Sequence, residues 1–439
     1  GGIGAVCYTH KRVGAYVRRS ISCFRPKITH LYSALAVLSF MHPAPASAQV
    51  SLQEAVLTAT ANDPGVEALR QEVAIKAVDI EAARDAYFPS ISLSGETSSA
   101  DDDDNGLTLS VTQVLMDWGK TKAEIEETSQ ARVQAMSDLK MAVEDLSFEI
   151  AGFFLDVEVL DRKIAYTKEY MTFARRLAKQ AQDRGRAGLS DNSEVARARL
   201  EIARADEQMA QLLANRQIAL AQLEYLVGTP ISDVSRPPDI GFSSHYGMPE
   251  KIRAAIRLAP EYISARASVA EAEAGVKSAK VQRFPTINLQ AQALLDMNGD
   301  TETAIGISTG IDLNSRGFGQ RQIQSAMLKV ESAKASLNGV ERELMNTASS
   351  ALQRLSLLRQ SEQSKALQLA ESEKVLATYE QQFVAGRREI LDLLTTGRDL
   401  YDAQIDEIDT YDERKRTAYE AAKDLGVLGT MLSVRPVLQ

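Results

Sequence analysis

The chain has 439 residues and a formal net charge of −9, and 44% of its residues are hydrophobic. The negative charge and the lack of a basic stripe with interleaved aromatic residues argue against nucleic-acid binding. Beyond residue 48 the sequence contains no cysteine and only one histidine, His245. It therefore offers no nucleophile paired with a base, and we expect neither an enzyme nor a bound cofactor or metal.

Residues 1–48 are expected to be an amino-terminal extension followed by a secretory signal peptide. A basic residue, an apolar stretch over residues 28–41 and two prolines lead to Ala46-Ser47-Ala48. This small-x-small pattern precedes signal cleavage, so we expect the mature chain to begin at Gln49. Because residue 49 is not cysteine, a lipid-modified amino terminus is not expected.

The sequence that follows repeats itself once. Asn62-Asp63-Pro64 opens a helical stretch that ends at Tyr87-Phe88-Pro89, and Leu258-Ala259-Pro260 opens one that ends at Arg283-Phe284-Pro285, an offset of 196 residues. A long unit repeated once predicts a duplicated structure and favours a symmetric assembly. The expected parts are a first repeat over 49–228, a linker over 229–249, a second repeat over 250–428 and a tail over 429–439.

Each copy contains two predicted strands of about ten residues, the length of a tilted transmembrane β-strand. They cover residues 90–98 and 107–116 in the first copy and 286–295 and 305–313 in the second. The predicted lipid-facing residues include Leu107, Leu109, Val111, Leu115, Leu289 and Ile307. The other face is polar and uncharged, as in a water-filled barrel, although a half-buried soluble sheet has the same period.

The loops within the strand pairs are polar, and aromatic residues gather at the opposite strand ends. The first loop contains Asp101–Asp104, which lacks the spacing of a calcium-binding loop and is expected to be a solvated acidic loop. We expect one membrane-interface girdle formed by Phe88, Trp118 and Phe284, together with Tyr87 and Phe318.

Two long helices with a heptad pattern are expected to follow the strands. The first runs from Gly119 to about residue 182, a length of about 95 Å. Its apolar residues from Met136 onward alternate spacings of three and four, and the second copy repeats this pattern from Ile323. Glycine-containing turns end both helices, and a further helix follows each turn. The pattern predicts supercoiled packing between neighbouring helices.

Four strands in one chain cannot close a conducting barrel, and an open strand edge cannot lie in lipid. Two chains would supply eight strands, whose side chains fill the interior. Three chains would supply twelve and leave a lumen. We therefore expect a mostly α-helical fold whose four strands per protomer contribute to a trimeric 12-stranded barrel, with the long helices forming an α-helical barrel on the periplasmic side.

These features resemble the TolC-like outer-membrane channel proteins of the efflux and type I secretion class, over about residues 50–428. The motifs that carry the resemblance are Ser51-Leu52-Gln53-Glu54-Ala55, the two Phe-Pro strand entries, Asp117-Trp118-Gly119-Lys120, and the turns Ala187-Gly188-Leu189 and Ala385-Gly386-Arg387-Arg388. The resemblance implies a homotrimer in the outer membrane of a Gram-negative bacterium. It also implies a periplasmic adaptor that docks to the closed tip and an inner-membrane pump that feeds it.

The resemblance assigns roles to residues near the two turns. A periplasmic gate is expected at Phe383, Arg388 and Asp392, with Glu194 of the first copy as a partner for Arg388. Where the family often has a second aspartate, this chain has Thr395. The alternative for Arg388 and Asp392 is an ordinary surface ion pair one turn apart. The expected adaptor contacts are Ala187, Gly188, Leu189, Ala385, Gly386 and Arg387.

The resemblance favours an exit duct for type I protein secretion, fed by an ABC-type transporter. Residues 385–403 resemble the secretion branch, and the missing lipid anchor removes a feature that is frequent among drug-efflux channels. Two alternatives stay open. One is the channel of a multidrug or small-molecule efflux pump, and the other is a soluble periplasmic coiled-coil adaptor.

Overall fold

A computed structural model describes residues 49–96, 106–188, 192–296, 300–310 and 319–433. The expected signal peptide, the Asp101–Asp104 run, Leu189 and Phe318 lie outside these residues. None of the helices in the described ranges has an apolar stretch of the length that crossing a bilayer requires.

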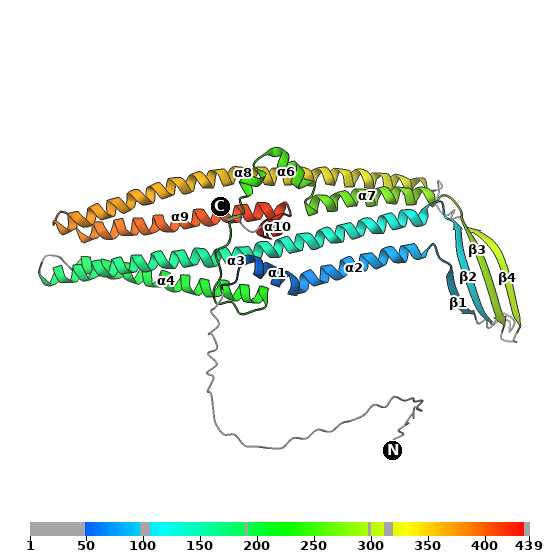
Figure 1. Ribbon diagram of the computed structural model, residues 1–439, viewed down its shortest axis with the longest axis horizontal. Helices are drawn as coiled ribbons and strands as arrows, with labels where there is room; N and C mark the ends of the chain where they lie inside the picture. Colours follow the sequence, from blue (N-terminus) through cyan, green and yellow to red (C-terminus); the bar gives the residue numbers. More distant parts are fainter. Residues whose placement is uncertain (1–48, 97–105, 189–191, 297–299, 311–318, 434–439) are drawn as a thin grey trace, which may run out of the picture. The chain divides into compact units, whose positions relative to one another are not determined.

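The elements follow one another in the same order in both copies (Figure 1). The first copy contains α1 (Leu52–Asn62), α2 (Pro64–Asp85), β1 (Ser90–Glu96), β2 (Gly106–Met116), α3 (Lys120–Arg186) and α4 (Asn192–Val227). The second contains α7 (Pro260–Val281), β3 (Thr286–Asp296), β4 (Thr301–Gly310), α8 (Gln320–Val384) and α9 (Ile390–Asp424). The short helices α5 (Phe242–Tyr246) and α6 (Pro249–Ile256) precede it, and α10 (Leu428–Ser433) follows it. The predicted duplicated and mostly helical fold is confirmed.

Local capping explains where the helices begin. Asp63 precedes α2 and accepts a hydrogen bond from the backbone N–H of Val66 at 2.8 Å. Pro64 and Pro260 occupy first turns, where the N–H that proline lacks would have no helical partner. Asp117 fixes the change from strand to helix, because its carboxylate accepts from the N–H groups of Gly119 and Thr121 at 2.9 and 2.7 Å.

The strands form one antiparallel sheet in the order β1-β2-β3-β4, at one end of the helices (Figure 1). The register places Ile91 opposite Val111, Val111 opposite Ala291, and Ala291 opposite Ile305. One face of the sheet is therefore largely apolar across all four strands, while the other carries mainly serine, threonine and glutamine. Ile91 and Ile305 are 72% and 80% exposed within a single chain, so this apolar face has no cover from the chain itself.

A β-bulge interrupts the alternation near the end of β2. The pairing with β3 shifts between Val114 and Met116, so Met116 lies opposite Ile287 and Leu115 has no partner in the register. The strict alternation that was predicted through Leu115 therefore breaks at this point. A bulge inserts one residue and bends the strand, here just before Asp117 turns the chain into α3.

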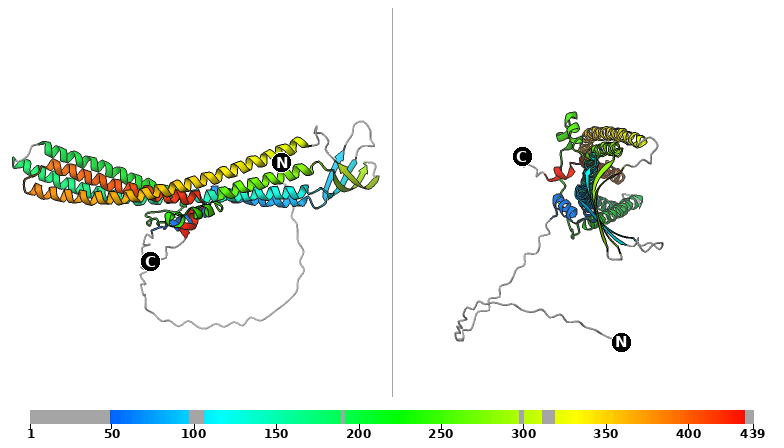
Figure 2. Two further views of the ribbon diagram at one scale, coloured as in Figure 1. Left: turned by 90° about the horizontal axis from the view of Figure 1, so that it is seen from above. Right: turned by 90° about the vertical axis from the view of Figure 1, so that its right-hand side faces the viewer.

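The helices pack side by side in two sets that share α3 and α8. Nearer the sheet the packing order is α2–α3–α7–α8, and beyond the middle it is α4–α3–α9–α8. Figure 2 shows the hairpins α3–α4 and α8–α9 lying together at the end away from the sheet. At about 1.5 Å per residue, the 67 residues of α3 extend for about 100 Å. Two helices thus connect the sheet with the distant turns.

Residues 229–249 lie against the middle of the helical layer that the two sets form, and they join the main hydrophobic core. Ile231, Ile240 and Phe242 are buried in a cluster with residues of α1, α3, α8 and α9. Tyr419 of α9 is 1% exposed and donates its hydroxyl to the carbonyl of Pro238 at 2.6 Å. Burial holds the pKa of Tyr419 far above its ordinary value, so the hydroxyl remains a donor.

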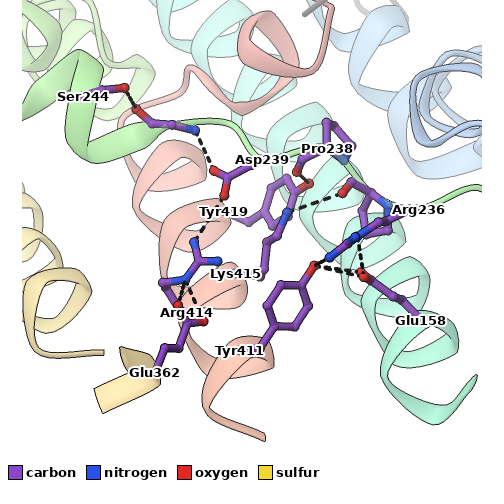
Figure 3. Close-up of polar contacts among 12 residues, drawn as sticks. Glu158, Arg236, Pro238, Asp239, Ser244, Glu362, Tyr411, Arg414, Lys415 and Tyr419 are labelled. Carbon is purple, nitrogen blue, oxygen red and sulfur yellow. Dashed lines mark hydrogen bonds and ion pairs between the residues drawn. The ribbon is translucent and has the colours of Figure 1, made fainter. Parts of the chain in front are cut away.

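Ion pairs and hydrogen bonds also join residues 229–249 to α3 and to α9 (Figure 3). Arg236 pairs with Glu158 of α3 at 2.7 Å and donates to the Tyr411 hydroxyl at 3.0 Å. That hydroxyl in turn donates to Glu158 at 2.9 Å. Asp239 accepts from Arg414 of α9 at 3.2 Å. Hydrogen bonds and ion pairs therefore hold residues 229–249 against α3 and α9. The role of this segment as a linker between the repeats stays a prediction.

The register predicts which sheet face meets lipid. Leu289 lies opposite Ile307 on the apolar face, whereas Gln290 lies opposite Gly306 on the polar face. Ile307→Arg should cost about 2–4 kcal/mol, because it places a guanidinium in hydrocarbon. Gln290→Arg is the matched control and should fold as wild type does. Reversible unfolding in lipid vesicles measures both changes. Equal losses at the two positions would show that the faces are assigned wrongly.

Candidate functional site

The two helical hairpins turn at the end of the structure opposite the sheet (Figure 1). Gly188 and Gly386 both have left-handed backbone angles, with φ of 71° and 73°. A side chain would strain this conformation, which explains a glycine at the end of each long helix. The N–H of Arg387 bonds the carbonyl of Gln382 at 2.8 Å and closes the second turn. The structure thus places Ala187, Gly188, Ala385, Gly386 and Arg387 in paired turns.

Arg388, one of the expected gate residues, is held within its own hairpin. Its Nη1 lies 3.4 Å from Oδ2 of Asp392, and its Nε donates to the side chain of Gln382 at 3.0 Å. The guanidinium also stacks on Tyr379, 3.9 Å from the ring centroid. Three contacts from α8 and α9 therefore orient Arg388, of which the sequence predicted only Asp392. Arginine commonly stacks on aromatic rings, and Tyr379 lies two turns before the glycine.

Phe383 links the two hairpins through apolar contact. It packs against a cluster that contains Leu177 of α3 and Ile390 and Leu393 of α9. The guanidinium of Arg184 on α3 lies 5.3 Å from the centroid of the Phe383 ring. An aromatic side chain at this position can therefore hold α8 and α9 against α3 near the turns.

Glu194 lies in the first turn of α4, on the hairpin that neighbours Arg388. The ion pair that the structure shows for Arg388 is the one with Asp392, and the cross-hairpin pair of Arg388 with Glu194 stays a prediction. Thr395 donates its hydroxyl to the carbonyl of Leu391 at 2.9 Å, as an ordinary helical threonine does. In the ranges that the structure describes, no group of acidic, histidine or cysteine side chains is arranged to hold a metal ion.

A buried carboxylate farther from the turns was not predicted. Glu201 of α4 is 3% exposed, and it accepts from the Tyr170 hydroxyl of α3 at 3.1 Å and pairs with Arg204 at 3.0 Å. Arg398 of α9 approaches Glu201 to 3.8 Å, and the rings of Tyr170 and Tyr401 stack at 4.9 Å. Burial, with the adjacent Glu201 carboxylate, raises the pKa of Tyr170, so its hydroxyl stays protonated. This cluster joins three helices and resists their separation.

The sheet end carries the aromatic residues that were expected at a membrane interface. The Trp118 and Phe284 rings lie 5.3 Å apart, and the indole N–H of Trp118 donates to the carbonyl of Pro285 at 2.8 Å. Phe88, two residues before β1, is 66% exposed. Two of the three expected residues are thus in contact, and all three lie at the same ends of the strands. Their role at an interface stays a prediction.

Comparison with known proteins agrees with this architecture. The family model "Outer membrane efflux protein" matches residues 56–229 and 252–423. Protein CyaE of Bordetella pertussis is 26% identical over 349 residues, which cover 74% of this chain and 73% of the relative. Outer membrane efflux protein BepC of Brucella suis is 22% identical over 370 residues, which cover 81% of this chain and 80% of the relative.

A solved structure shows the same fold. The outer membrane protein VceC of Vibrio cholerae superposes with a TM-score of 0.73 at 17% identity, covering 85% of this chain and 96% of that one. The family model matches both sequence copies and well over half of the chain, and the family consists of transport channels and not of enzymes. The chain therefore belongs to the outer membrane efflux protein family, and it is an outer-membrane channel protein of Gram-negative bacteria with a large periplasmic helical part.

Proposed function

We propose that three copies of this chain form the exit duct of a tripartite export system, together with a periplasmic adaptor and an inner-membrane transporter. The observation that carries the proposal is the open four-stranded sheet, whose edge strands are β1 and β4. Lipid offers no hydrogen bonds to their free backbone groups, so each edge needs a strand from another chain. Because β1 and β4 run in opposite directions, β4 of one protomer can pair antiparallel with β1 of the next.

Exposed apolar side chains along the outermost helices support the same assembly. Ile75 and Val78 of α2 are 50% and 67% exposed, and Leu328, Leu357 and Leu367 of α8 are 64%, 65% and 70% exposed. α2 and α8 are the outermost helices in the half nearer the sheet, and α8 is also outermost in the half beyond the middle, so a neighbouring protomer can cover these side chains.

The cargo that we favour is a protein substrate of a type I system with an ABC-type transporter. This choice rests on the likeness of residues 385–403 to the secretion branch. Export of small molecules is the second candidate, and the word "efflux" in the family description and in the name of BepC favours it. In both cases the paired turns would receive the adaptor, and Phe383, Arg388, Asp392 and Glu194 would form the gate.

Removal of the channel from its host distinguishes the two cargoes. Type I secretion predicts that one large protein disappears from the medium and accumulates in the cells, while sensitivity to small antibiotics stays unchanged. Quantitative proteomics of the medium and growth inhibition by a panel of antibiotics measure the two effects, and restoring the wild-type gene is the control. An unchanged set of secreted proteins with increased sensitivity to several antibiotics would instead support small-molecule efflux.

The gate proposal predicts the effect of Arg388→Ser. The change removes a partly exposed ion pair of about 0.2–1 kcal/mol, a cation–π contact of about 0.5–1 kcal/mol and the hydrogen bond to Gln382, three times over in a trimer. The closed tip should therefore open more often, with higher conductance in planar bilayers. Asp392→Ala should have a smaller effect, because Tyr379 and Gln382 still hold Arg388.

Arg387→Ser is the matched control for this experiment, since Arg387 is exposed and adjacent to Arg388. We expect its conductance to equal that of the wild type. If Arg388→Ser assembles normally and conducts as wild type does, Arg388 does not hold the gate, and the apolar contact of Phe383 becomes the better explanation.

A further inference from the structure

A groove of about 390 Å³ lies between the first turns of α3 and the last turns of α7, next to the ends of β2 and β3. Its apolar lining comes from Trp118, Ala123 and Val281. Trp118 is 44% exposed, yet its indole is fixed by the hydrogen bond to Pro285 and by contact with Phe284. The groove thus has a rigid aromatic wall at the level where the membrane-facing sheet ends.

Lysines line the groove beside this apolar surface. Lys122 projects from α3, and Lys277 and Lys280 from α7, and among the described residues of the lining Glu126 is the one acidic side chain. Lys277 pairs with Glu126 at 2.7 Å. Within the part of the chain that the structure describes, neither Lys122 nor Lys280 forms an ion pair. The described lining residues therefore carry three positive charges and one negative charge, a net charge of +2.

The opposite face of α7 has a different character. It borders a second groove, shared with α8, whose lining includes Ser268, Gly275, Ser278, Gln282 and Ser325. With 100° of rotation per helical residue, Gly275 and Lys277 point in nearly opposite directions. The same groove also contains Glu271, Lys329 and Glu127 of α3, so this face is polar and partly charged, which in a channel wall suits the water-filled passage. The face with Trp118 and the lysines suits the outer side, where lipid lies.

Assembly would leave the lysine groove open. It lies between α3 and α7, which are neighbours within one chain, whereas the free borders of the helical layer on this side are α2 and α8. A second protomer covering those borders does not cover the groove. The site is therefore complete in one protomer and would occur once per chain.

We propose that this groove binds an anionic phospholipid of the inner leaflet. The phosphate lies at Lys122 and Lys280, and the glycerol and the first acyl carbons lie against Trp118 and Val281. Lysine ammonium groups bind phosphate as point charges, and tryptophan prefers the headgroup level of a bilayer. A soluble anion would use the lysines but not the apolar wall, which is why the proposal commits to a lipid.

Lipid binding to purified trimer in a neutral detergent tests the proposal. Phosphatidylglycerol and phosphatidylcholine are titrated separately, and native mass spectrometry counts the lipids that stay bound. Phosphatidylglycerol should occupy one site per protomer and phosphatidylcholine should bind at least about tenfold more weakly. The double variant Lys122→Gln, Lys280→Gln should lose at least about tenfold in affinity for phosphatidylglycerol. It keeps Lys277, whose ion pair with Glu126 joins α3 to α7.

Two controls test whether binding depends on the lysines of this groove and whether a soluble anion competes with the lipid. Lys334→Gln with Lys374→Gln removes two exposed lysines of α8 outside the groove and should bind phosphatidylglycerol as wild type does. Inorganic phosphate at millimolar concentration should not displace the lipid. The proposal is overturned if the groove variant and wild type bind phosphatidylglycerol equally, or if both lipids bind wild type equally. Displacement of the lipid by inorganic phosphate would show a soluble-anion site and would also overturn it.

Discussion

The architecture depends on one constraint, which is that backbone N–H and C=O groups cannot be left unpaired in hydrocarbon. The sheet satisfies these groups between its four strands and leaves two edges, β1 and β4. Everything else about the membrane part follows from this arrangement. The apolar face is continuous across all four strands, as the predicted contact with lipid requires. The two edges call for strands from neighbouring chains, because the described residues contain no fifth strand.

The long helices α3 and α8 connect the sheet with the turns at the opposite end of the structure. α3 and α8 take part in both helical sets, so the two halves of the wall share two continuous elements. In the middle, residues 229–249 are fixed by the Tyr419 hydrogen bond and by the network around Arg236 and Tyr411 (Figure 3). Toward the tip, the buried Glu201 cluster still joins three helices, whereas Arg388 is held by partly exposed contacts. Contacts of this strength suit an end that opens when a partner binds the open form better.

Much of the fold could be predicted because its signals are local or periodic. The matching prolines at the start of α2 and α7 revealed the duplication, and the alternation around Leu289 and Ile307 identified the apolar sheet face. The bulge at Leu115 could not be predicted, since an apolar residue there continues the alternation. The position of the bulge depends on how β2 pairs with β3, which lies about 170 residues farther along the chain.

The contacts of the candidate gate were less predictable than the turns that carry it. Family resemblance pointed to Arg388 and Asp392, but the stacking of Arg388 on Tyr379 depends on how the two helices of the hairpin face each other. Glu201 did leave a signal in the sequence. It lies between Ala198 and Ala205 on the buried stripe of α4. A buried carboxylate is costly unless hydrogen bonds or ion pairs compensate its charge. Its Tyr170 and Arg398 partners come from other helices and required the structure.

Disulfide trapping between β1 and β4 tests the shared barrel most directly. Ser92→Cys is combined in turn with Ala304→Cys, Gly306→Cys or Ser308→Cys, all on the polar face. Within one chain these strands are three strand spacings apart, about 14 Å, which is beyond the reach of a disulfide. The account predicts that at least one pair gives covalent dimers and trimers on oxidation in membranes, and that Ser92→Cys with Ile307→Cys, on opposite faces, does not. No cross-link from any pair, or a ladder that extends beyond trimers, would contradict it.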